Sequence, residues 1–314
     1  MARHDSHTVH GMRRSFFYAG IFLLLLLTVP AHRVLERLSV SGAAPVDPER
    51  IVSLAPSVTE TLYALGLGPK VVGVTQFCAY PPDATTKPRV AGFSDINLEA
   101  VVRVLPDLVA LPIDKTFNQA LVERLGFPVL TLDTRSLNGL IASIEKLGHA
   151  TGHAREAEAL VQEFREGLRA ARKKAQGKPR PRVLFSVMHS YQGSTGITEI
   201  NVIGQDGFYN ELIEAAGGVN AYQGNLAFPR LSQESIIFLN PDVIIDVVPE
   251  LENLESVRQG WQKLASVAAV RDNRLFLFAG GADTVPGPRS MQTLAKLSRA
   301  FHPDQIRNTE GAPQ

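Results

Sequence analysis

Short, mostly apolar runs alternate with amphipathic segments along most of the chain. In the first half, the runs at 51–54, 71–75, 108–111 and 129–132 predict buried strands. The helices predicted between them begin near residue 57 and cover 98–105 and 118–125, and Ser57 with Glu60 forms a capping-box pattern. Strands that alternate with helices indicate a mostly parallel sheet flanked by helices.

The second half repeats this order of elements. Strands are predicted at 182–186, 243–247 and 274–278, and the last helix at 290–301. Both halves also carry one motif, in which Glu99 or Glu234 stands seven residues before a Pro-Asp pair. A repeat distance of 135 residues is too long for a solenoid. The pattern therefore predicts two similar α/β lobes that share a ligand cleft.

A long amphipathic segment lies between the two halves, at 155–175. Its apolar residues recur with helical spacing, acids stand at its start and bases at its end, as the helix dipole favours. A helix of this length spans ~32 Å, enough to cross between two lobes. We expect a single stiff connection of this kind to permit modest opening and closing rather than a large hinge swing.

The N-terminal segment has the pattern of an export signal. Arg13 and Arg14 precede an uncharged run at 16–31 that ends in small residues, and no cysteine stands near its end, which excludes lipid-anchored export. We expect a periplasmic protein, with a retained N-terminal membrane anchor as the alternative. The patterns predict a signal peptide at 1–31, a flexible leader at 32–49, an N-terminal lobe at 50–150, a linking helix at 151–178, a C-terminal lobe at 179–303 and a disordered tail at 304–314.

Composition and missing motifs narrow the function further. A formal net charge of +1 gives no electrostatic reason to expect nucleic acid as a partner. The single cysteine, Cys78, is predicted to be a small buried residue. The chain has no Walker A motif, nucleophile elbow or dinucleotide fingerprint, so we expect no enzyme and no cofactor. His149 and His153 have the spacing of metal ligands on one helix, but no third ligand accompanies them and we predict no metal site.

Aromatic residues in predicted loops are the first candidates for ligand contact. Phe77, Phe93 and Phe228 lie outside amphipathic stripes and would stack on a large, partly apolar ligand. Packing beneath the loops is the structural alternative for these three, and it is the interpretation favoured for Tyr80. His189 and Tyr191 follow a predicted strand, at the end where α/β proteins bind ligands.

From residue 50 to residue 303 the chain resembles the periplasmic solute-binding proteins of ABC importers for cobalamin, siderophores and haem. The motifs that carry the resemblance are those at 50–60, 80–82, 97–99, 106–107, 216–220, 232–234, 241–242 and 288–289. The resemblance implies two lobes joined by one long helix and capture of a ligand without chemistry. It also implies that Glu99 and Glu234 meet arginines of a membrane permease dimer, with the binding protein itself a monomer.

Within that family the chain looks most like the cobalamin binders. The resemblance implies ligand contact for Asp283 and for the three phenylalanines, although cobalamin binders tend to carry Tyr or Trp at those three positions. Ferric siderophore and haem are the alternative ligands: Arg230 and Arg289 would suit an anionic chelate, and His189 or Tyr191 an iron centre. The alternative from another class is an exported two-lobe enzyme, such as a metal chelatase.

Overall fold

The computed structural model describes residues 47–92, 95–113, 122–123, 126–192, 196–205, 207–248 and 254–303. The chain divides into two units, Met1–Ala44 and Pro45–Gln314, and all of the described residues belong to the second. No helix within the described ranges is both long and apolar enough to cross a membrane. The predicted signal peptide, most of the predicted leader and all of the predicted tail lie outside these ranges.

The N-terminal lobe is built on a five-stranded sheet in the order β3-β2-β1-β4-β5, with every neighbouring pair parallel. The predicted strands and helix α4 are present, and the predicted helix at 118–125 lies mostly outside the described residues. In this lobe, the strands are β1 Ile51–Ser53, β2 Val71–Thr75, β3 Arg89–Ala91, β4 Leu108–Pro112 and β5 Val129–Leu132, and the helices are α3 Pro56–Ala64, α4 Leu98–Arg103 and α6 Leu137–Ala150, with short 3-10 turns at Gly68–Lys70 and Pro82–Thr86.

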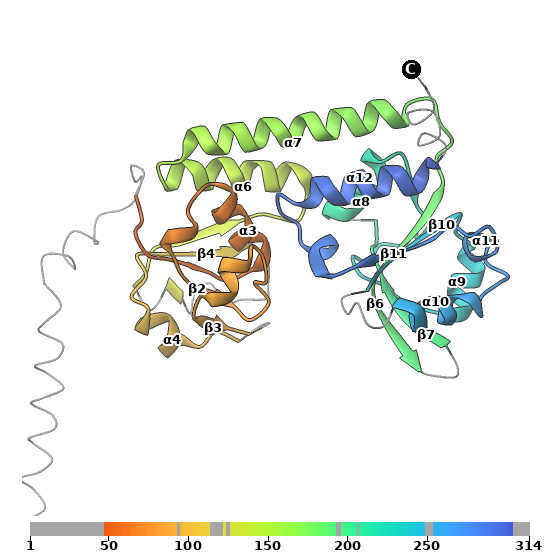
Figure 1. Ribbon diagram of the computed structural model, residues 1–314, viewed down its shortest axis with the longest axis horizontal. Helices are drawn as coiled ribbons and strands as arrows, with labels where there is room; N and C mark the ends of the chain where they lie inside the picture. The colour runs from red at the N-terminus through yellow and green to blue at the C-terminus, as the bar shows by residue number, and fades with distance from the viewer. Residues whose placement is uncertain are drawn as a thin grey trace, which may run out of the picture. The chain divides into compact units, whose positions relative to one another are not determined.

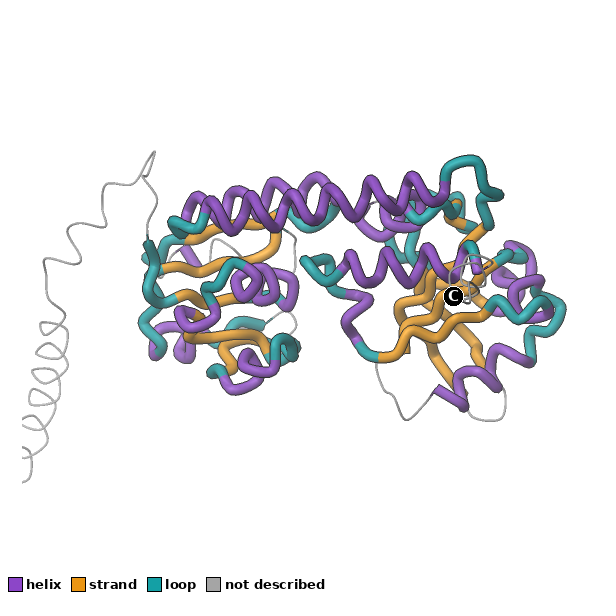
Figure 2. Tube along the Cα trace, turned by 45° about the horizontal axis from the view of Figure 1, so that its top comes forward, coloured by secondary structure: helices purple, strands orange, loops and turns teal. Residues whose placement is uncertain are grey.

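The C-terminal lobe has a mixed sheet in the order β11-β10-β6-β7-β9, with β8 paired to β6. Pairs β6–β10, β10–β11 and β6–β8 are parallel, whereas β6–β7 and β7–β9 are antiparallel. Its strands are β6 Arg182–Gln192, β7 Gly196–Val202, β8 Val219–Asn220, β9 Arg230–Ser232, β10 Val243–Val248 and β11 Leu275–Ala279, and its helices are α8 Gly207–Ala215, α9 Gln233–Leu239, α10 Leu254–Gln262, α11 Ala268–Arg271 and α12 Ser290–Phe301, with a 3-10 turn at Gly281–Thr284. Helices lie beside the strands of both lobes (Figure 2).

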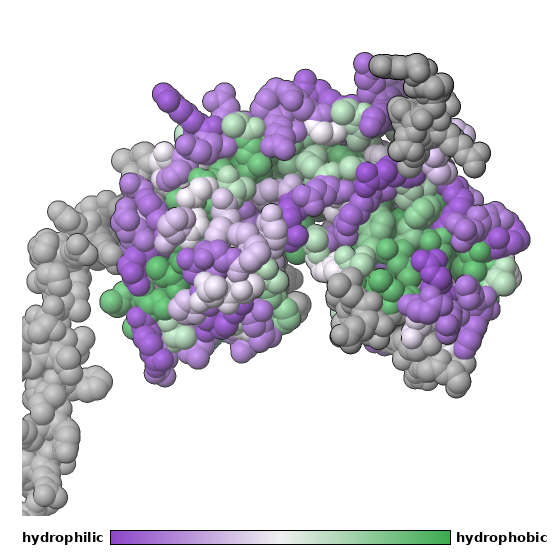
Figure 3. All heavy atoms as spheres, viewed as in Figure 1, coloured by the Kyte–Doolittle hydropathy of each residue, from purple (hydrophilic) through white to green (hydrophobic). Residues whose placement is uncertain are grey.

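The long helix α7, Ala154–Ala175, connects the two lobes as predicted (Figure 1). Its buried residues are those of the predicted apolar stripe: Ala157, Val161, Phe164, Leu168 and Ala171. Figure 3 shows mostly hydrophilic side chains along α7 at the top of the view. The fold prediction of two α/β lobes joined by one long helix is therefore confirmed.

One cluster of buried apolar side chains extends through both lobes and the connecting helix. It includes Leu62 on α3, Leu140 on α6, Phe164 on α7, Leu212 on α8 and Leu297 on α12. Because burial of apolar surface is the main stabilising contribution to a fold, separating the lobes would expose those members of the cluster that meet at the junction to water. The expectation of small adjustments between the lobes stays a prediction.

The repeated Glu-to-Pro-Asp motif has the same local structure in both lobes. At the start of β1, Arg50 donates its backbone N–H to Asp107 Oδ1 at 2.9 Å and its Nη2 to the Val104 carbonyl at 2.7 Å. The start of β6 repeats both contacts: the Arg182 N–H donates to Asp242 Oδ2 at 2.8 Å and Arg182 Nη1 to the Leu239 carbonyl at 2.7 Å. Arginine thus satisfies carbonyls that the helix end leaves unpaired, and aspartate ties the next strand in place.

Each of the two repeated helices also ends in a left-handed residue, Leu105 at φ 44° and Asn240 at φ 41°. Asparagine adopts this conformation more readily than leucine, for which it is uncommon. The conformation recurs at the same place in the motif in spite of this difference in residue type. The repeat is therefore structural as well as sequential, and it holds α4 and α9 in the same local setting.

Candidate functional site

Glu99 and Glu234 occupy the first turns of α4 and α9. Both helices begin on a side-chain cap: Asn97 Oδ1 accepts the Ala100 N–H at 3.0 Å, and Ser232 Oγ accepts the Ser235 N–H at 3.4 Å. Both glutamates are exposed, Glu99 with 82% of its side chain. Two hydrogen bonds lower the pKa of Glu234: the larger effect comes from the Ser232 side chain and the smaller from the backbone N–H of Glu234 itself. Each lobe therefore presents one exposed carboxylate to solvent from the start of a capped helix.

The two glutamates differ in their neighbours one turn further along. Glu99 forms an ion pair with Arg103 at 2.6 Å, in which both side chains are exposed. The residue at the equivalent place on α9 is Phe238, whose exposed fraction of 88% is unusual for an aromatic side chain. Glu234 forms no ion pair within the described part of the chain. The C-terminal acid is thus an unpaired charge beside an exposed ring, and the N-terminal acid is already paired.

Smaller apolar side chains accompany the acids on both helices. Val102 on α4 and Ile237 on α9 stand at matching positions and are 43% and 44% exposed, and Leu105 is 66% exposed. Apolar surface next to a charge is the composition expected of a protein interface, where an apolar centre is combined with polar groups that set orientation.

The ligand-contact candidates of the N-terminal lobe follow β2 and β3. Because the strands are parallel, their carboxyl ends lie along one edge of the sheet. Phe77 follows β2 there and is 49% exposed. Phe93 follows β3 but lies outside the described residues. The structure therefore gives Phe77 an exposed ring at the edge where α/β proteins bind ligands.

The candidates of the C-terminal lobe are spread over strands β6 and β9. Phe228 precedes β9 and is 60% exposed, and Arg230, the first residue of β9, forms an exposed ion pair with Glu199 at 3.4 Å. His189 and Tyr191 do not lie in a loop after a short strand, as the sequence suggested, because β6 continues to Gln192. Their backbones pair with Ile200 and Ile197 of β7. Their side chains lie outside the described part of the structure.

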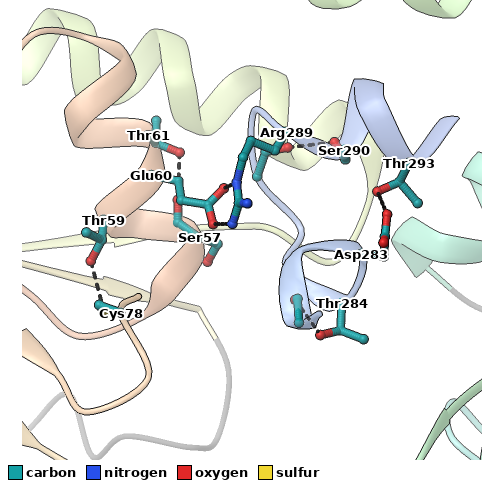
Figure 4. Close-up of polar contacts among 12 residues, drawn as sticks. Ser57, Thr59, Glu60, Thr61, Cys78, Asp283, Thr284, Arg289, Ser290 and Thr293 are labelled. Atoms are coloured by element: carbon teal, nitrogen blue, oxygen red, sulfur yellow. Dashed lines mark hydrogen bonds and ion pairs between the residues drawn. The ribbon is translucent and has the colours of Figure 1, made fainter. Parts of the chain in front are cut away.

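Asp283 is buried inside the C-terminal lobe, with an exposed fraction of 2%. Its Oδ1 accepts the Thr293 hydroxyl at 2.8 Å and its Oδ2 accepts Lys296 Nζ at 2.7 Å. Figure 4 shows its contact with Thr293 on α12. Both carboxylate oxygens are thus engaged within the lobe, where they join the 3-10 turn at Gly281–Thr284 to α12, and contact of Asp283 with a ligand stays a prediction.

Glu60 and Arg289 form a contact between the lobes that sequence reasoning missed. Glu60 lies on α3 and is 4% exposed, while Arg289 directly precedes α12, 229 residues later. Arg289 Nε donates to Glu60 Oε2 at 2.9 Å, and Arg289 Nη2 donates to Glu60 Oε1 (Figure 4). The guanidinium also lies over the Tyr80 ring, 3.9 Å from its centroid. Hydrogen bonding to Glu60 raises the pKa of Arg289 above its ordinary value.

The predicted capping box at Ser57 is wrong, and the ion pair explains why. Helix α3 begins at Pro56, which suits the first helical position because it lacks an N–H, and Ala55 is its N-cap without a side-chain bond. Glu60 therefore points to Arg289 instead of back to its own helix. The pairing also means that Arg289 is already occupied and is not a free cation for an anionic chelate.

The described residues contain no group of three or more His, Cys, Asp or Glu side chains arranged to hold a metal ion. His149 belongs to α6, whereas His153 is the N-cap of α7, and Gly152 at φ 73° turns the chain between them. The two histidines therefore do not share a helix face. Cys78 is 1% exposed and lies 3.1 Å from the Thr59 hydroxyl, which confirms the prediction that it is buried.

Comparison with known proteins gives a consistent result. The model of the periplasmic binding protein family matches residues 51–279. An uncharacterized ABC transporter substrate-binding lipoprotein of Bacillus subtilis (strain 168) is 31% identical over 83% of this chain and 82% of its own length. A vitamin B12-binding protein of Vibrio cholerae is 29% identical over 81% of this chain and 90% of its own length. The solved structure of the periplasmic heme-binding protein from Roseiflexus sp. RS-1 is 30% identical, with a TM-score of 0.69, over 81% of this chain and 98% of that one.

Proposed function

Because the chain belongs to the periplasmic binding protein family, we propose that it captures cobalamin or a related metal chelate between its lobes and delivers it to the permease of an ABC importer. The relatives are named for binding. The observation that carries the proposal is the matched pair of exposed acids, one on each lobe, at equivalent places in a structural repeat.

The acids support docking on a partner with two equivalent subunits. Equivalent positions on two similar lobes suit a partner that presents the same basic group twice, as a permease dimer does. Exposed charges of this kind set orientation and association rate more than affinity. The local anchoring of α4 and α9 by Arg50 and Arg182 would keep both acids at fixed places on their lobes.

The two docking points are expected to contribute unequally. Arg103 neutralises Glu99 within its own helix, whereas Glu234 has Phe238 beside it and keeps its full charge. We expect Arg103→Gln to strengthen docking by freeing Glu99, and Phe238→Ser to weaken it by removing an apolar anchor. Binding to permease in detergent or nanodiscs, measured by surface plasmon resonance at two salt concentrations, checks both. If neither substitution changes the affinity, the helices α4 and α9 are not the docking surface.

Exposed phenylalanines on both lobes support a large ligand with apolar faces. Phe77 and Phe228 each retain about half or more of their surface in solvent, so each lobe presents aromatic surface that a ligand would cover. A corrin or porphyrin ring offers flat faces on which such rings stack. Haem remains the second candidate, with His189 or Tyr191 as the iron ligand, and a ferric siderophore the third. The engagement of Arg289 by Glu60 leaves Arg230, paired with Glu199, as the remaining predicted cation for an anionic chelate.

Ligand identity can be tested by calorimetry with cyanocobalamin, haemin and a ferric hydroxamate. We expect cyanocobalamin to bind, with Phe77→Ala and Phe228→Ala each weakening it about tenfold, the loss expected for one stacked ring. Phe238→Ala is the matched control, because it removes an exposed ring of the same type from α9. The affinity of this variant for cyanocobalamin should equal that of the unmodified protein. Binding of haemin or the ferric chelate alone would change the ligand and keep the transport function.

The enzymatic alternative makes a different prediction. A two-lobe chelatase would insert a metal ion into its ligand or remove one from it, without any membrane partner. Incubation of purified protein with each chelate, followed by absorption spectra and mass spectrometry, should return the ligand unchanged. Catalytic turnover would overturn the proposal. The proposed site of action is the periplasm, after export by the N-terminal segment, with a retained anchor as the alternative that N-terminal sequencing would detect.

A further inference from the structure

The ends of α7 and α12 form a basic pocket remote from the ligand-contact candidates. It comprises Lys178, Arg274, Ser298 and His302, which line two adjoining grooves with volumes of about 490 and 540 Å³. Lys178 precedes β6 and Arg274 precedes β11, so the pocket lies at the amino ends of these parallel strands. The ligand site proposed above is expected at the opposite ends, the carboxyl ends.

Four polar atoms in this pocket are buried without a hydrogen-bond partner among the described residues. Lys178 Nζ, Arg274 Nε and Ser298 Oγ are donors, and His302 Nε2 becomes one when the imidazole is protonated. Buried polar groups in folded proteins are nearly always satisfied, and a buried cation is costly unless an anion or acceptor faces it. Their convergence on one place therefore indicates that the pocket is built for an acceptor that the described residues do not supply.

The charges that line the two grooves favour an anion. Among the described residues they carry five permanent cations, Lys174, Lys178, Arg180, Arg274 and Arg299, and one carboxylate, that of Asp242. Asp242 already accepts the Arg182 N–H. Helix C-termini attract cations, which accounts for exposed bases such as Lys173 and Lys174. The helix dipole does not account for polar atoms that are buried without a partner.

The surroundings hold these groups in place. Arg274 Nη2 donates to the Phe301 carbonyl at 3.0 Å, which fixes the guanidinium at the end of α12. Gly217, at φ 90°, lies against His302, and a Cβ there would stand 2.9 Å from Nε2. Any side chain at this position would fill the space beside the imidazole. Burial, then the charges of Lys178 and Arg274, lower the pKa of His302 below its ordinary value, an effect that a bound anion would oppose.

We propose that the basic pocket binds a phosphate group, either free inorganic phosphate or the headgroup phosphate of an anionic lipid. A tetrahedral oxyanion carries several acceptor oxygens, and it can receive hydrogen bonds from lysine, arginine, serine and imidazole together. One bound group would join the end of α7, the starts of β6 and β11, and the end of α12. The proposal does not rest on the proposed transport function, because none of these residues belongs to the ligand-contact or docking candidates.

Thermal unfolding of the purified protein in phosphate-free buffer tests the site. Inorganic phosphate should raise Tm saturably, by about 5 °C, and chloride at matched ionic strength should not. Lys178→Met and His302→Gln should lose this rise, while Lys173→Met, which removes an exposed base from the same helix end, should keep it. Without phosphate, Lys178→Met should melt no lower than the unmodified protein, since it removes a buried unpaired charge. An equal rise in Tm in all variants overturns the proposal. So does an unmodified protein that shows neither a rise in Tm with phosphate nor, in the experiment described next, binding to anionic vesicles.

A second arm distinguishes the two sources of phosphate. The same proteins are sedimented with vesicles of phosphatidylcholine and with vesicles containing phosphatidylglycerol. Retention on the anionic vesicles that Lys178→Met abolishes, that Lys173→Met keeps and that inorganic phosphate competes away would identify a lipid headgroup. A Tm rise with phosphate and no retention would identify a free oxyanion. Retention that is equal in both variants reflects general surface charge and counts against a lipid headgroup in this pocket.

Discussion

Replacing both Glu99 and Glu234 by arginine is expected to abolish ligand uptake and to leave ligand affinity unchanged. Both carboxylates are exposed in the first turns of α4 and α9, and neither helix carries a ligand-contact candidate. If each acid faces a basic group of the permease, reversal places like charges opposite each other at two points. Like-charge juxtaposition across an interface costs several kcal/mol, so a loss of uptake by about 100-fold or more is the expected result.

The measurement is uptake of radiolabelled ligand by cells or proteoliposomes that contain the permease and depend on added binding protein. Calorimetry on the same variants gives ligand affinity. Glu255→Arg is the matched control, because Glu255 is also an exposed acid in the first turn of a helix, α10. A fall in ligand affinity would assign the two acids to the ligand site. Uptake at the normal rate would show that docking uses another surface.

The single reversals should differ because the two acids are not equivalent. Glu234→Arg is expected to cost more uptake than Glu99→Arg, since Arg103 already neutralises Glu99. Raising the salt concentration should reduce the difference, because the charges are exposed and screened. Equal effects at low salt would mean that the permease displaces Arg103 when it docks.

Elements with a strong local pattern were predictable from the sequence. The five buried residues of α7 recur with helical spacing, and the last helix was predicted at 290–301, where α12 lies. Both depend on residues close together in the chain, so periodicity alone is sufficient. The repeat of Glu99 and Glu234 was also visible in the sequence. The contacts of Arg50 and Arg182 that accompany it were not, because Arg50 and Asp107, for example, are 57 residues apart.

Features that depend on distant partners could not be predicted in this way. Glu60 has the spacing of a capping box, and only the fold brings Arg289 to it. Asp283 was assigned to the ligand, and its partners Thr293 and Lys296 become apparent only when α12 packs beside the turn. The extension of β6 past Ser186 requires its antiparallel partner β7, which had no separate signal in the sequence. Tertiary pairing decided the capping box and the length of β6 against the local pattern, whereas contact of Asp283 with a ligand stays a prediction of the resemblance.

The ion pair between Glu60 and Arg289 is expected to contribute strongly to stability. Arg289→Met should lower the free energy of unfolding by about 3–5 kcal/mol, because it leaves a buried carboxylate without its partner. Only 3% of the Glu60 side chain and 19% of the Arg289 side chain are exposed, so solvent can do little to compensate. Urea unfolding followed by circular dichroism gives the value, and the matched control Arg271→Met, which breaks the exposed pair with Asp272, should change it little.

A second pair of variants separates the charge from the packing. Glu60→Gln with Arg289→Met removes both charges, and it should be more stable than Arg289→Met alone, since no unpaired ion remains buried. If the double variant is as unstable as the single one, the arginine acts through its packing on Tyr80. The pair joins α3 to the start of α12 across the lobes, so its loss should also increase hydrogen exchange in both elements. Unchanged exchange together with a lower stability would place the effect within one lobe, and the pair would then have no part in holding the lobes together.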